Sequence, residues 1–222
     1  MAKKIGFITI GQSPREDIVC EIAEILGPEV EIIERGALDS LSRNEIESLR
    51  PKKGDFPLIT RLRDGSSAIV GKKKIIPLLK RKIEELEQQG VQLIGLLCTD
   101  DFPELKSERL LLQPYRLLFN LVMAILKKGT LAVLAPLEEQ GEDVKKKWEK
   151  TGLKVVVETL NPYQEFSDAE LAIERIKKED AGLIVLDCIG YSQRIKEKIR
   201  LATGKPVILP RTVLARMIKE LM

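Results

Sequence analysis

Cys98 and Cys188 are the residues of this sequence best suited to chemistry, because each stands at the end of a predicted buried strand. A thiolate can remove a proton from a carbon next to a carboxylate, and a thiol on the other side can return a proton to the opposite face. The thiol pKa of about 8.5 falls near helix N-termini and cations, which favours the reactive thiolate. The pair therefore predicts proton transfer at a carbon acid, with no metal or organic cofactor.

Such a reaction needs hydrogen-bond donors placed where the enediolate charge develops. Thr99, Ser13 and backbone N–H groups at helix N-termini are candidates for this role. We expect Arg15 to hold a remote anionic group, and Arg116 or Arg211 could bind a carboxylate or phosphate through two parallel hydrogen bonds. The predicted substrate-binding positions are Gly11, Ser13, Arg15, Thr99, Arg116, Asp187 and Gly190.

Each of these residues also has a purely structural interpretation. Free cysteines often fill cores. Ser13 could be an N-cap with Pro14 as the first helical residue, and Asp187 could cap the next helix. Cys20 is expected in the core, Trp148 is expected to pack against a neighbouring element, and the lysine run 145–147 is expected on a solvated helix face.

The elements that must position these residues alternate along the chain. Apolar runs predict strands at 5–10, 30–33, 58–62, 67–70, 91–97, 130–134, 154–157, 183–186 and 207–209. Amphipathic segments predict helices at 15–26, 72–89, 114–128, 137–150, 167–179, 191–201 and 212–221, with a short helix starting at a Ser42–Glu45 capping box. Asp64-Gly65 predicts a hairpin turn. This alternation indicates an α/β fold with a parallel sheet.

The chain has two comparable halves, each with a strand that ends near a cysteine. We therefore expect two pseudo-symmetric, doubly wound parallel-sheet lobes, 1–106 plus 208–222 and 107–207, with an interlobe cleft. Ligands of open α/β sheets bind at the carboxyl ends of the strands. In this arrangement Cys98 and Cys188 would face each other across the cleft.

Composition excludes several classes of protein. Among the 222 residues there is no histidine, so histidine triads and histidine metal sites are ruled out. Three cysteines form no disulfide framework. A net charge of +3 and 4% aromatic residues argue against a nucleic-acid partner. No segment reaches the roughly 20 apolar residues of a membrane span, and no nucleotide-binding motif is present. We expect a cytoplasmic protein, with a homodimer left open.

The residues resemble two related groups of proteins. The strand-end cysteines, Cys98-Thr99 and Cys188-x-Gly190, resemble the two-thiol signature of the aspartate/glutamate/hydantoin racemase superfamily. Most of the chain is similar to the AroM family, through segments 5–17, 96–102, 113–116, 131–136 and 183–191. The superfamily implies two α/β lobes with the site between them. The amino-acid racemases usually have Cys-Asn-Thr and Gly-Cys-Thr where this chain has Cys98-Thr99-Asp100 and Asp187-Cys188-Ile189. The acids after Cys98 disfavour an anionic substrate.

Three hypotheses follow from these residues. The first is a cofactor-independent racemase, epimerase or related isomerase of a small carboxylate, with Cys98 and Cys188 as opposed acid–base catalysts. The second is a non-catalytic protein that binds a small anion, or a regulatory protein, on the same fold. The third uses one cysteine as a covalent nucleophile in an isomerase or lyase.

Overall fold

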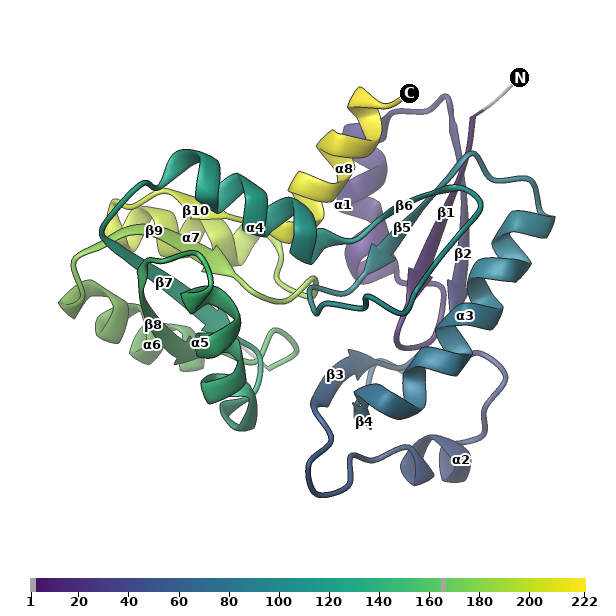
Figure 1. Cartoon of the computed structure of the whole chain (residues 1–222), viewed down its shortest axis with the longest axis horizontal. Helices are drawn as coiled ribbons and strands as arrows, with labels where there is room; N and C mark the ends of the chain where they lie inside the picture. The colour runs from purple at the N-terminus through teal and green to yellow at the C-terminus, as the bar shows by residue number, and fades with distance from the viewer. Residues whose placement is uncertain (1–2, 165–166) are drawn as a thin grey trace. The chain divides into compact units, whose positions relative to one another are not determined.

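The computed structural model describes residues 3–164 and 167–222. The chain folds into two compact units, residues 1–114 with 214–222, and residues 115–213. Each unit contains a four-stranded sheet whose strands are paired in parallel, with helices packed on it (Figure 1). The predicted α/β class with parallel sheets is confirmed.

The sheet of the first unit has the order β2-β1-β5-β6. Its strands and the helices on its faces are β1 (Lys3–Thr9), β2 (Val30–Gly36), β5 (Leu93–Leu97), β6 (Leu110–Leu112), α1 (Glu16–Leu26), α3 (Lys72–Gln88) and α8 (Pro210–Glu220). Gly95 in β5 lies against Phe7 and Ile218, where an added Cβ would come within 3.3 Å of the Ile218 side chain. The ends of α1 and α8 are joined by a hydrogen bond from Lys219 Nζ to Ile25 O at 2.6 Å.

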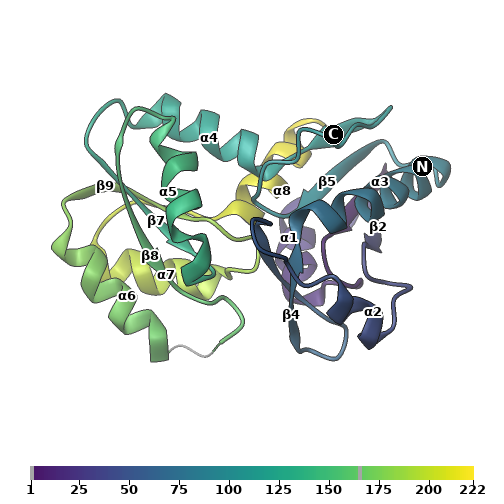
Figure 2. The same cartoon turned by 60° about the horizontal axis from the view of Figure 1, so that its bottom comes forward.

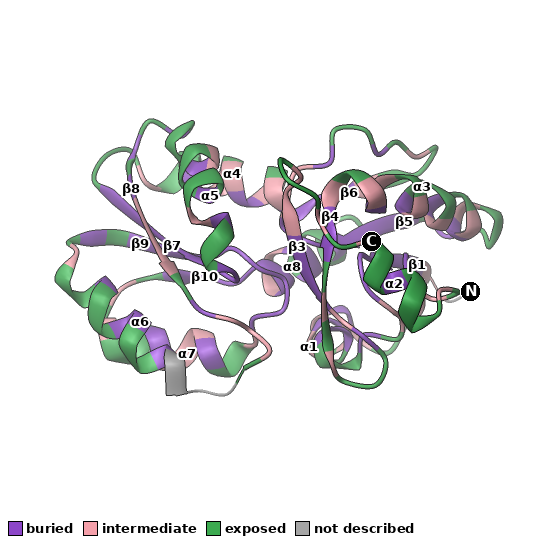
Figure 3. Cartoon of the chain, turned by 90° about the horizontal axis from the view of Figure 1, so that it is seen from below, coloured by how far each residue is buried: buried purple, intermediate pink, exposed green. Residues whose placement is uncertain are grey.

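The other face of this sheet carries α3. Its buried side chains pack against those of the central strands and against Cys98; the cluster includes Ile8, Ile75, Leu79, Ile83, Leu86, Ile94 and Leu96. Because side chains alternate between the two faces of a strand, Cys98 extends the row formed by Ile94 and Leu96. Burial of these central strands is visible in Figure 3.

An insertion between β2 and α3 forms a small antiparallel hairpin, β3 (Pro57–Arg61) and β4 (Ser67–Gly71), together with α2 (Arg43–Ser48). The predicted Asp64-Gly65 turn connects the two strands, with Gly65 at φ +84°. The predicted capping box is present: Glu45 N–H donates to Ser42 Oγ, and Ser42 N–H donates to Glu45 Oε2 at 2.8 Å. This hairpin also packs into the cluster around Cys98.

The sheet of the second unit has the order β10-β9-β7-β8. Its elements are α4 (Pro114–Ile125), β7 (Thr130–Ala135), a 3-10 helix η1 (Glu138–Gln140), α5 (Gly141–Glu149), β8 (Lys154–Thr159), α6 (Ser167–Lys178), β9 (Ala181–Leu186), α7 (Gln193–Thr203) and β10 (Val207–Ile208). Helices α6 and α7 cover one face, as Figure 2 shows, and this face includes Cys188. Helices α4 and α5 cover the other face, where Trp148 packs against neighbouring elements as predicted and is fully buried.

Both sheets have the same topology. When the strands are numbered within their own four-stranded sheet, each sheet has the order 2-1-3-4, so the order reverses between the first and third strands. In an open α/β sheet, such a switch point is where the strand ends leave a crevice for ligands. Cys98 follows β5, the third strand of the first sheet, and Cys188 follows β9, the third strand of the second.

Three sequence predictions need correction. The segment 110–112, placed in the second lobe with no element predicted for it, is β6 and pairs with β5 of the first sheet. Ile208, predicted in the first lobe, is paired with Val185 of β9 in the second sheet. Cys20, predicted in the core, is exposed. Each helical residue advances about 100°, so Cys20 points away from the stripe formed by Ile18 and Ile22.

No helix among the described residues is long and apolar enough to cross a membrane.

Candidate functional site

The turn after Cys98 carries a lysine–aspartate ion pair. Lys72, the first residue of α3, places its Nζ 2.7 Å from Asp100 Oδ2 and 5.1 Å from the centre of the Phe102 ring. Cys98 and Thr99 are buried, with 7% and 6% of their surface exposed. The charge of Asp100, expected to repel an anionic substrate, is therefore balanced by a neighbouring cation. Asp101 Oδ1 is buried and has no hydrogen-bond partner among the described residues.

The side chain of Gln113 is bonded to the backbone of this turn. Its side-chain Oε1 accepts a hydrogen bond from Phe102 N–H at 3.3 Å, and its Nε2 donates to Phe102 O at 3.2 Å. Gln113 is itself buried. An amide that bonds both backbone groups of one residue fixes the turn between β5 and β6.

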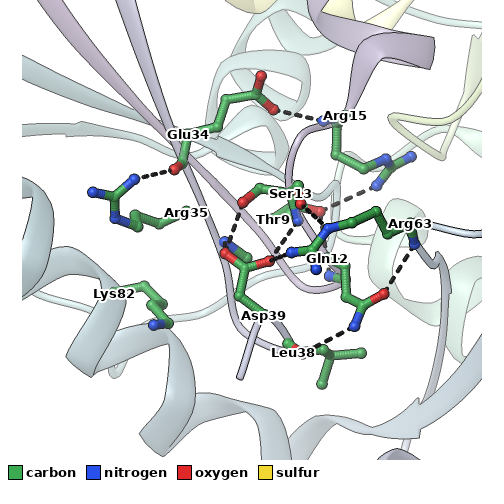
Figure 4. Close-up of polar contacts among 12 residues, drawn as sticks. Thr9, Gln12, Ser13, Arg15, Glu34, Arg35, Leu38, Asp39, Arg63 and Lys82 are labelled. Atoms are coloured by element: carbon green, nitrogen blue, oxygen red, sulfur yellow. Dashed lines mark hydrogen bonds and ion pairs between the residues drawn. The ribbon is translucent and has the colours of Figure 1, made fainter. Parts of the chain in front are cut away.

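The loop after β1 is held by Asp39 (Figure 4). The two carboxylate oxygens of Asp39 accept hydrogen bonds from Ser13 N–H, from Ser13 Oγ and from Gly36 N–H, each at 2.7 Å. Arg63, in the β3–β4 turn, donates to Asp39 Oδ1 at 3.2 Å and to Ser13 O at 2.8 Å. Ser13 therefore directs both of its donors to an internal carboxylate, and the loop is tied to the hairpin.

The beginning of α1 differs from the expected N-cap. Helix α1 starts at Glu16, the Ser13–Pro14 bond is cis, and the N-cap position is Arg15, which makes no side-chain cap. Arg15 N–H donates instead to Glu34 Oε2 at 2.7 Å. Ser13 is not the N-cap: it lies two residues before the N-cap position, and its hydroxyl donates to Asp39 instead.

Arg15 is buried in the first unit. Its Nε and Nη2 donate to the two oxygens of Asp17 at 2.8 Å, and its Nη1 donates to Thr9 Oγ1 at 3.1 Å. The charge of Arg15 is thus paired with Asp17, so an anion would have to compete with an internal partner. Burial raises the pKa of Glu34, against the lowering effects of the Arg15 N–H and of the Arg15 charge.

Gly11 lies where the hairpin meets this loop. A Cβ at this position would overlap the side chain of Thr60, whose Oγ1 is buried and has no hydrogen-bond partner among the described residues. Gly11 N–H donates to Thr9 Oγ1 at 3.2 Å. Position 11 therefore requires glycine because β3 approaches the loop too closely to leave room for a side chain.

The segment before Cys188 carries a second lysine–aspartate ion pair. Asp187 Oδ2 accepts a hydrogen bond from Trp148 Nε1 at 2.8 Å and forms an ion pair with Lys147. Lys147 Nζ also lies 5.3 Å from the centre of the Tyr115 ring. The lysine run 145–147 is therefore only partly a solvated face: Lys147 is largely buried, because Asp187 and two aromatic rings surround its ammonium group.

Two tyrosines border the turn after Cys188. A Cβ on Gly190 would come within 2.9 Å of Tyr163 Oη, so the tyrosine ring lies directly on this glycine. Tyr191 is almost completely buried, and its hydroxyl donates to Leu160 O. Burial, with smaller effects of Cys188, Asp187 and Tyr163, raises the pKa of Tyr191 well above its usual value of 10.0. Tyr191 therefore stays a neutral donor at physiological pH.

Arg211 contacts the backbone of the turn after Cys188. It is 1% exposed, and its Nε and Nη2 donate to Ile189 O at 3.2 Å and Gly190 O at 2.8 Å. A small cavity of about 100 Å³ opens beside the turn and is lined by Leu160, Asn161, Pro162, Gln164, Ala169, Tyr191, Ser192 and Ile195. Arg116 is exposed on α4, and its carbonyl accepts a hydrogen bond from Asn120.

The predicted residues fall into separate groups in the two units. Gly11, Ser13, Arg15, Cys98 and Thr99 belong to the first unit, whereas Asp187, Cys188 and Gly190 belong to the second, with Arg116 on the surface. Within the described part of the chain, no group of three or more cysteine, aspartate or glutamate residues is placed to hold a metal ion.

Sequence reasoning missed three of the residues that hold the turns around the two cysteines: Lys72, Gln113 and Lys147. One signal was available for Lys72. A lysine in the first turn of a helix opposes the macrodipole, so a nearby acidic partner should be sought, and Asp100 supplies one. For Gln113 and Lys147 the sequence carried no local signal.

The fold is that of a group of racemases and a decarboxylase of known structure. The chain superposes on allantoin racemase from Klebsiella pneumoniae with a TM-score of 0.66 and 16% identity, covering 99% of this chain and 87% of that chain. Aspartate racemase from Picrophilus torridus superposes with a TM-score of 0.61 and 15% identity, covering 98% of this chain and 93% of that chain. Arylmalonate decarboxylase superposes with a TM-score of 0.60 and 14% identity, covering 97% of this chain and 92% of that chain. At these identities the likeness establishes a shared fold.

The sequence identifies the family more narrowly than the fold does. The family model described as AroM protein matches residues 5–222, so the chain belongs to the AroM family. No curated protein matches the sequence significantly.

Proposed function

We propose that this protein is a cofactor-independent racemase, epimerase or related isomerase of a small carboxylate, with Cys98 and Cys188 as opposed acid–base catalysts. The observation that carries the proposal is topological. Each cysteine follows the third strand of a 2-1-3-4 parallel sheet, at the switch point where α/β sheets bind ligands. Two equivalent positions in two equivalent units suit a reaction that treats the two faces of one carbon alike.

In the proposed reaction, the carbon next to the carboxylate loses one proton and gains another. The thiolate of one cysteine takes the proton from the carbon next to the carboxylate, and the electron pair of the C–H bond moves into the carboxylate to give an enediolate. The thiol of the other cysteine then donates its proton to the opposite face. The two cysteines exchange protonation states, and the reverse reaction uses them in the opposite roles.

Backbone and hydroxyl donors are proposed to bind the substrate carboxylate. Thr99 directly follows Cys98, and Gly190 lies two residues after Cys188, so both stand beside a thiol. Ser13, Arg15 and Asp187 have internal partners, and we assign them the role of holding the backbone near the two cysteines. A substrate that bound through the same groups would have to displace those partners.

The names of the structural relatives support the substrate class. Aspartate and arylmalonate, in the names of two of them, are carboxylates with an acidic carbon next to the carboxyl group. Transfer of this chemistry to the present chain is part of the proposal.

The test is interconversion of enantiomers. A panel of chiral 2-substituted carboxylic acids is incubated with the protein in D₂O, and optical rotation and loss of the α-proton NMR signal are followed. We expect turnover of at least one acid, its loss in both Cys98→Ala and Cys188→Ala, and its retention in Cys20→Ala, the exposed-cysteine control. Racemisation that survives both single substitutions would exclude the two-thiol mechanism.

A non-catalytic anion-binding or regulatory protein is the alternative. The observation that favours it is the change of residues after both cysteines: Asp100 and Ile189 stand where the amino-acid racemases usually have threonine. This alternative predicts that a small carboxylate raises the thermal unfolding midpoint although no acid of the panel is turned over, and that Cys98→Ala and Cys188→Ala bind it equally well.

A further inference from the structure

Helix α3 begins with three successive lysines, Lys72, Lys73 and Lys74. The first turn of a helix carries the positive end of the macrodipole, so a cation there is unfavourable unless a partner compensates it. Lys73 is exposed to solvent, and Lys74 Nζ donates to two loop carbonyls at 2.7 and 2.8 Å. Lys72 is matched by a carboxylate instead, because its Nζ lies 2.7 Å from Asp100 Oδ2.

The Lys72–Asp100 pair is fixed to the turn after Cys98. Lys72 Nζ lies 5.1 Å from the centre of the Phe102 ring, a distance at which the face of an aromatic ring attracts a cation. Phe102 is completely buried, and Gln113 bonds both of its backbone groups. Only 23% of the Lys72 side chain and 13% of the Asp100 side chain are exposed, so salt screens this pair less than a surface pair.

Asp100 is close to Cys98 because a single residue separates them in the chain. A segment of two residues spans at most about 7 Å. A carboxylate at such a distance opposes the ionisation of a thiol. With an effective dielectric constant of about 20, one unit charge about 7 Å away moves an ionisation midpoint by about 1–2 pH units. The charge of Asp100 is therefore large enough to decide whether Cys98 ionises near neutral pH.

We propose that Lys72 is a positioning residue for Cys98: by holding and neutralising Asp100, it keeps the turn after the thiol from opposing the ionisation of that thiol. The inference rests on the proposed function, in which Cys98 takes and gives a proton and must therefore be accessible in both protonation states. Lys72 acts through Asp100, and we assign it no contact with the substrate.

Other charged groups belong to elements around the same strand ends. On the α3 side, Asp55 Oδ1 accepts a hydrogen bond from Lys73 N–H at 3.2 Å. The remaining groups are Asp101 on the turn, Lys74 on α3, Arg61 and Arg63 on the hairpin, and Arg15, Asp17, Glu34 and Asp39 near the end of β1 and the start of α1. All of these stay in place in the variants that alter only Lys72 and Asp100, so their contributions cancel when those variants are compared.

The test measures the ionisation of Cys98 alone. In a Cys20→Ser/Cys188→Ser background, Cys98 is the single thiol, and its thiolate is followed by ultraviolet absorbance during a pH titration. The protein that also carries Cys98→Ser is subtracted as the baseline, which removes the absorbance of the tyrosines. This readout needs no reagent to reach the buried sulfur.

Five variants separate the charges. Lys72→Met removes the cation and Lys72→Arg keeps it, whereas Asp100→Asn removes the carboxylate and Lys72→Met/Asp100→Asn removes both. Lys73→Met is the matched control, because it removes an exposed lysine from the adjacent position of the same helix. Circular dichroism identifies the folded variants.

We expect the pH midpoint of Cys98 ionisation to rise by about one unit in Lys72→Met and to fall in Asp100→Asn. It should stay near that of the background protein in Lys72→Arg and in Lys73→Met. The double variant should return to the background midpoint, because it lacks both opposing charges. Where Lys72→Met does not fold, the fall in Asp100→Asn and the return in the double variant decide.

An unchanged midpoint in both Lys72→Met and Asp100→Asn would overturn the proposal, because the charge of Asp100 would then not reach the thiol. A double variant raised as far as Lys72→Met would overturn it too, since Lys72 would then act on Cys98 without Asp100. The same holds if Cys98 of the background protein does not ionise before the protein unfolds.

The measurement needs no turnover, so it separates this inference from the proposed reaction. The expected midpoints without racemisation of any acid would contradict the reaction and leave the role of Lys72 intact. Racemisation with midpoints that do not depend on Lys72 would support the reaction and contradict the role of Lys72.

Discussion

Lys147 and Asp187 form an ion pair one residue before Cys188, with only 13% and 1% of their side-chain surfaces exposed. Trp148 Nε1 donates to the same carboxylate oxygen, so α5 is anchored to the end of β9 by two neighbouring residues. The pair therefore fixes the strand end from the face of the sheet opposite to Cys188.

Removal of one partner of this pair should destabilise the fold. Lys147→Met removes the lysine from the buried carboxylate of Asp187, and breaking a buried pair in this way costs about 3–5 kcal/mol. We expect the loss in the free energy of unfolding measured by urea titration. Lys146→Met, which removes an exposed lysine from the same helix, should change it by less than about 0.5 kcal/mol. Equal effects of the two substitutions would show that the ion pair contributes nothing.

Replacing Asp39 should lower the free energy of unfolding far more than replacing Arg63, although the two residues are paired. Asp39→Ala leaves the Ser13 and Gly36 donors without their acceptor, at about 1–3 kcal/mol for a buried unsatisfied group. Arg63 is 53% exposed, and an exposed ion pair contributes about 0–1 kcal/mol. Urea titration of both variants measures the difference. A larger loss in Arg63→Ala would mean that the hairpin contact, not the carboxylate, holds the β1 loop.

Glu34 should make stability fall as pH rises. Burial raises the pKa of Glu34 in the folded protein above its usual value of 4.5, so the folded state holds the proton in a range where the unfolded state has released it. The free energy of unfolding then decreases as pH rises from 4.5 through the folded pKa, and the penalty is complete once the pH exceeds the folded pKa. Glu34→Gln, which can still accept from Arg15 N–H, should remove this dependence.

The check is unfolding of the wild type and Glu34→Gln at a series of pH values. The stability gained by the variant should grow from acidic to neutral pH. A gain that is constant, or that shrinks, would contradict a raised pKa.

The three cysteines should react at two different rates. Cys20 is exposed on α1, whereas Cys98 and Cys188 are buried. We expect Ellman's reagent to modify one thiol rapidly in the native protein and all three in denaturant, and Cys20→Ser to remove the fast phase. A fast phase that persists in Cys20→Ser would show that one strand-end cysteine is accessible to the reagent.

The sequence alone determined the features that depend on neighbouring residues. Apolar runs that stop near Cys98 and Cys188 predicted both strand ends, because a continuous apolar segment is what a buried parallel strand requires. Asp64-Gly65 and the Ser42–Glu45 box specified a turn and a helix start through bonds within four residues. β6 was missed because its three residues are too few to show a period.

The tertiary structure decided which partner each polar side chain takes. Ser13 had the residue type and position of an N-cap, yet its hydroxyl bonds Asp39, 26 residues away. Lys147 belonged to a charged run, yet it is enclosed by Asp187 and aromatic rings. Arg211 had the chemistry of a carboxylate ligand, yet it holds the turn after Cys188. A polar side chain takes the partner that folding brings within about 3 Å, and the linear order of residues does not state that distance.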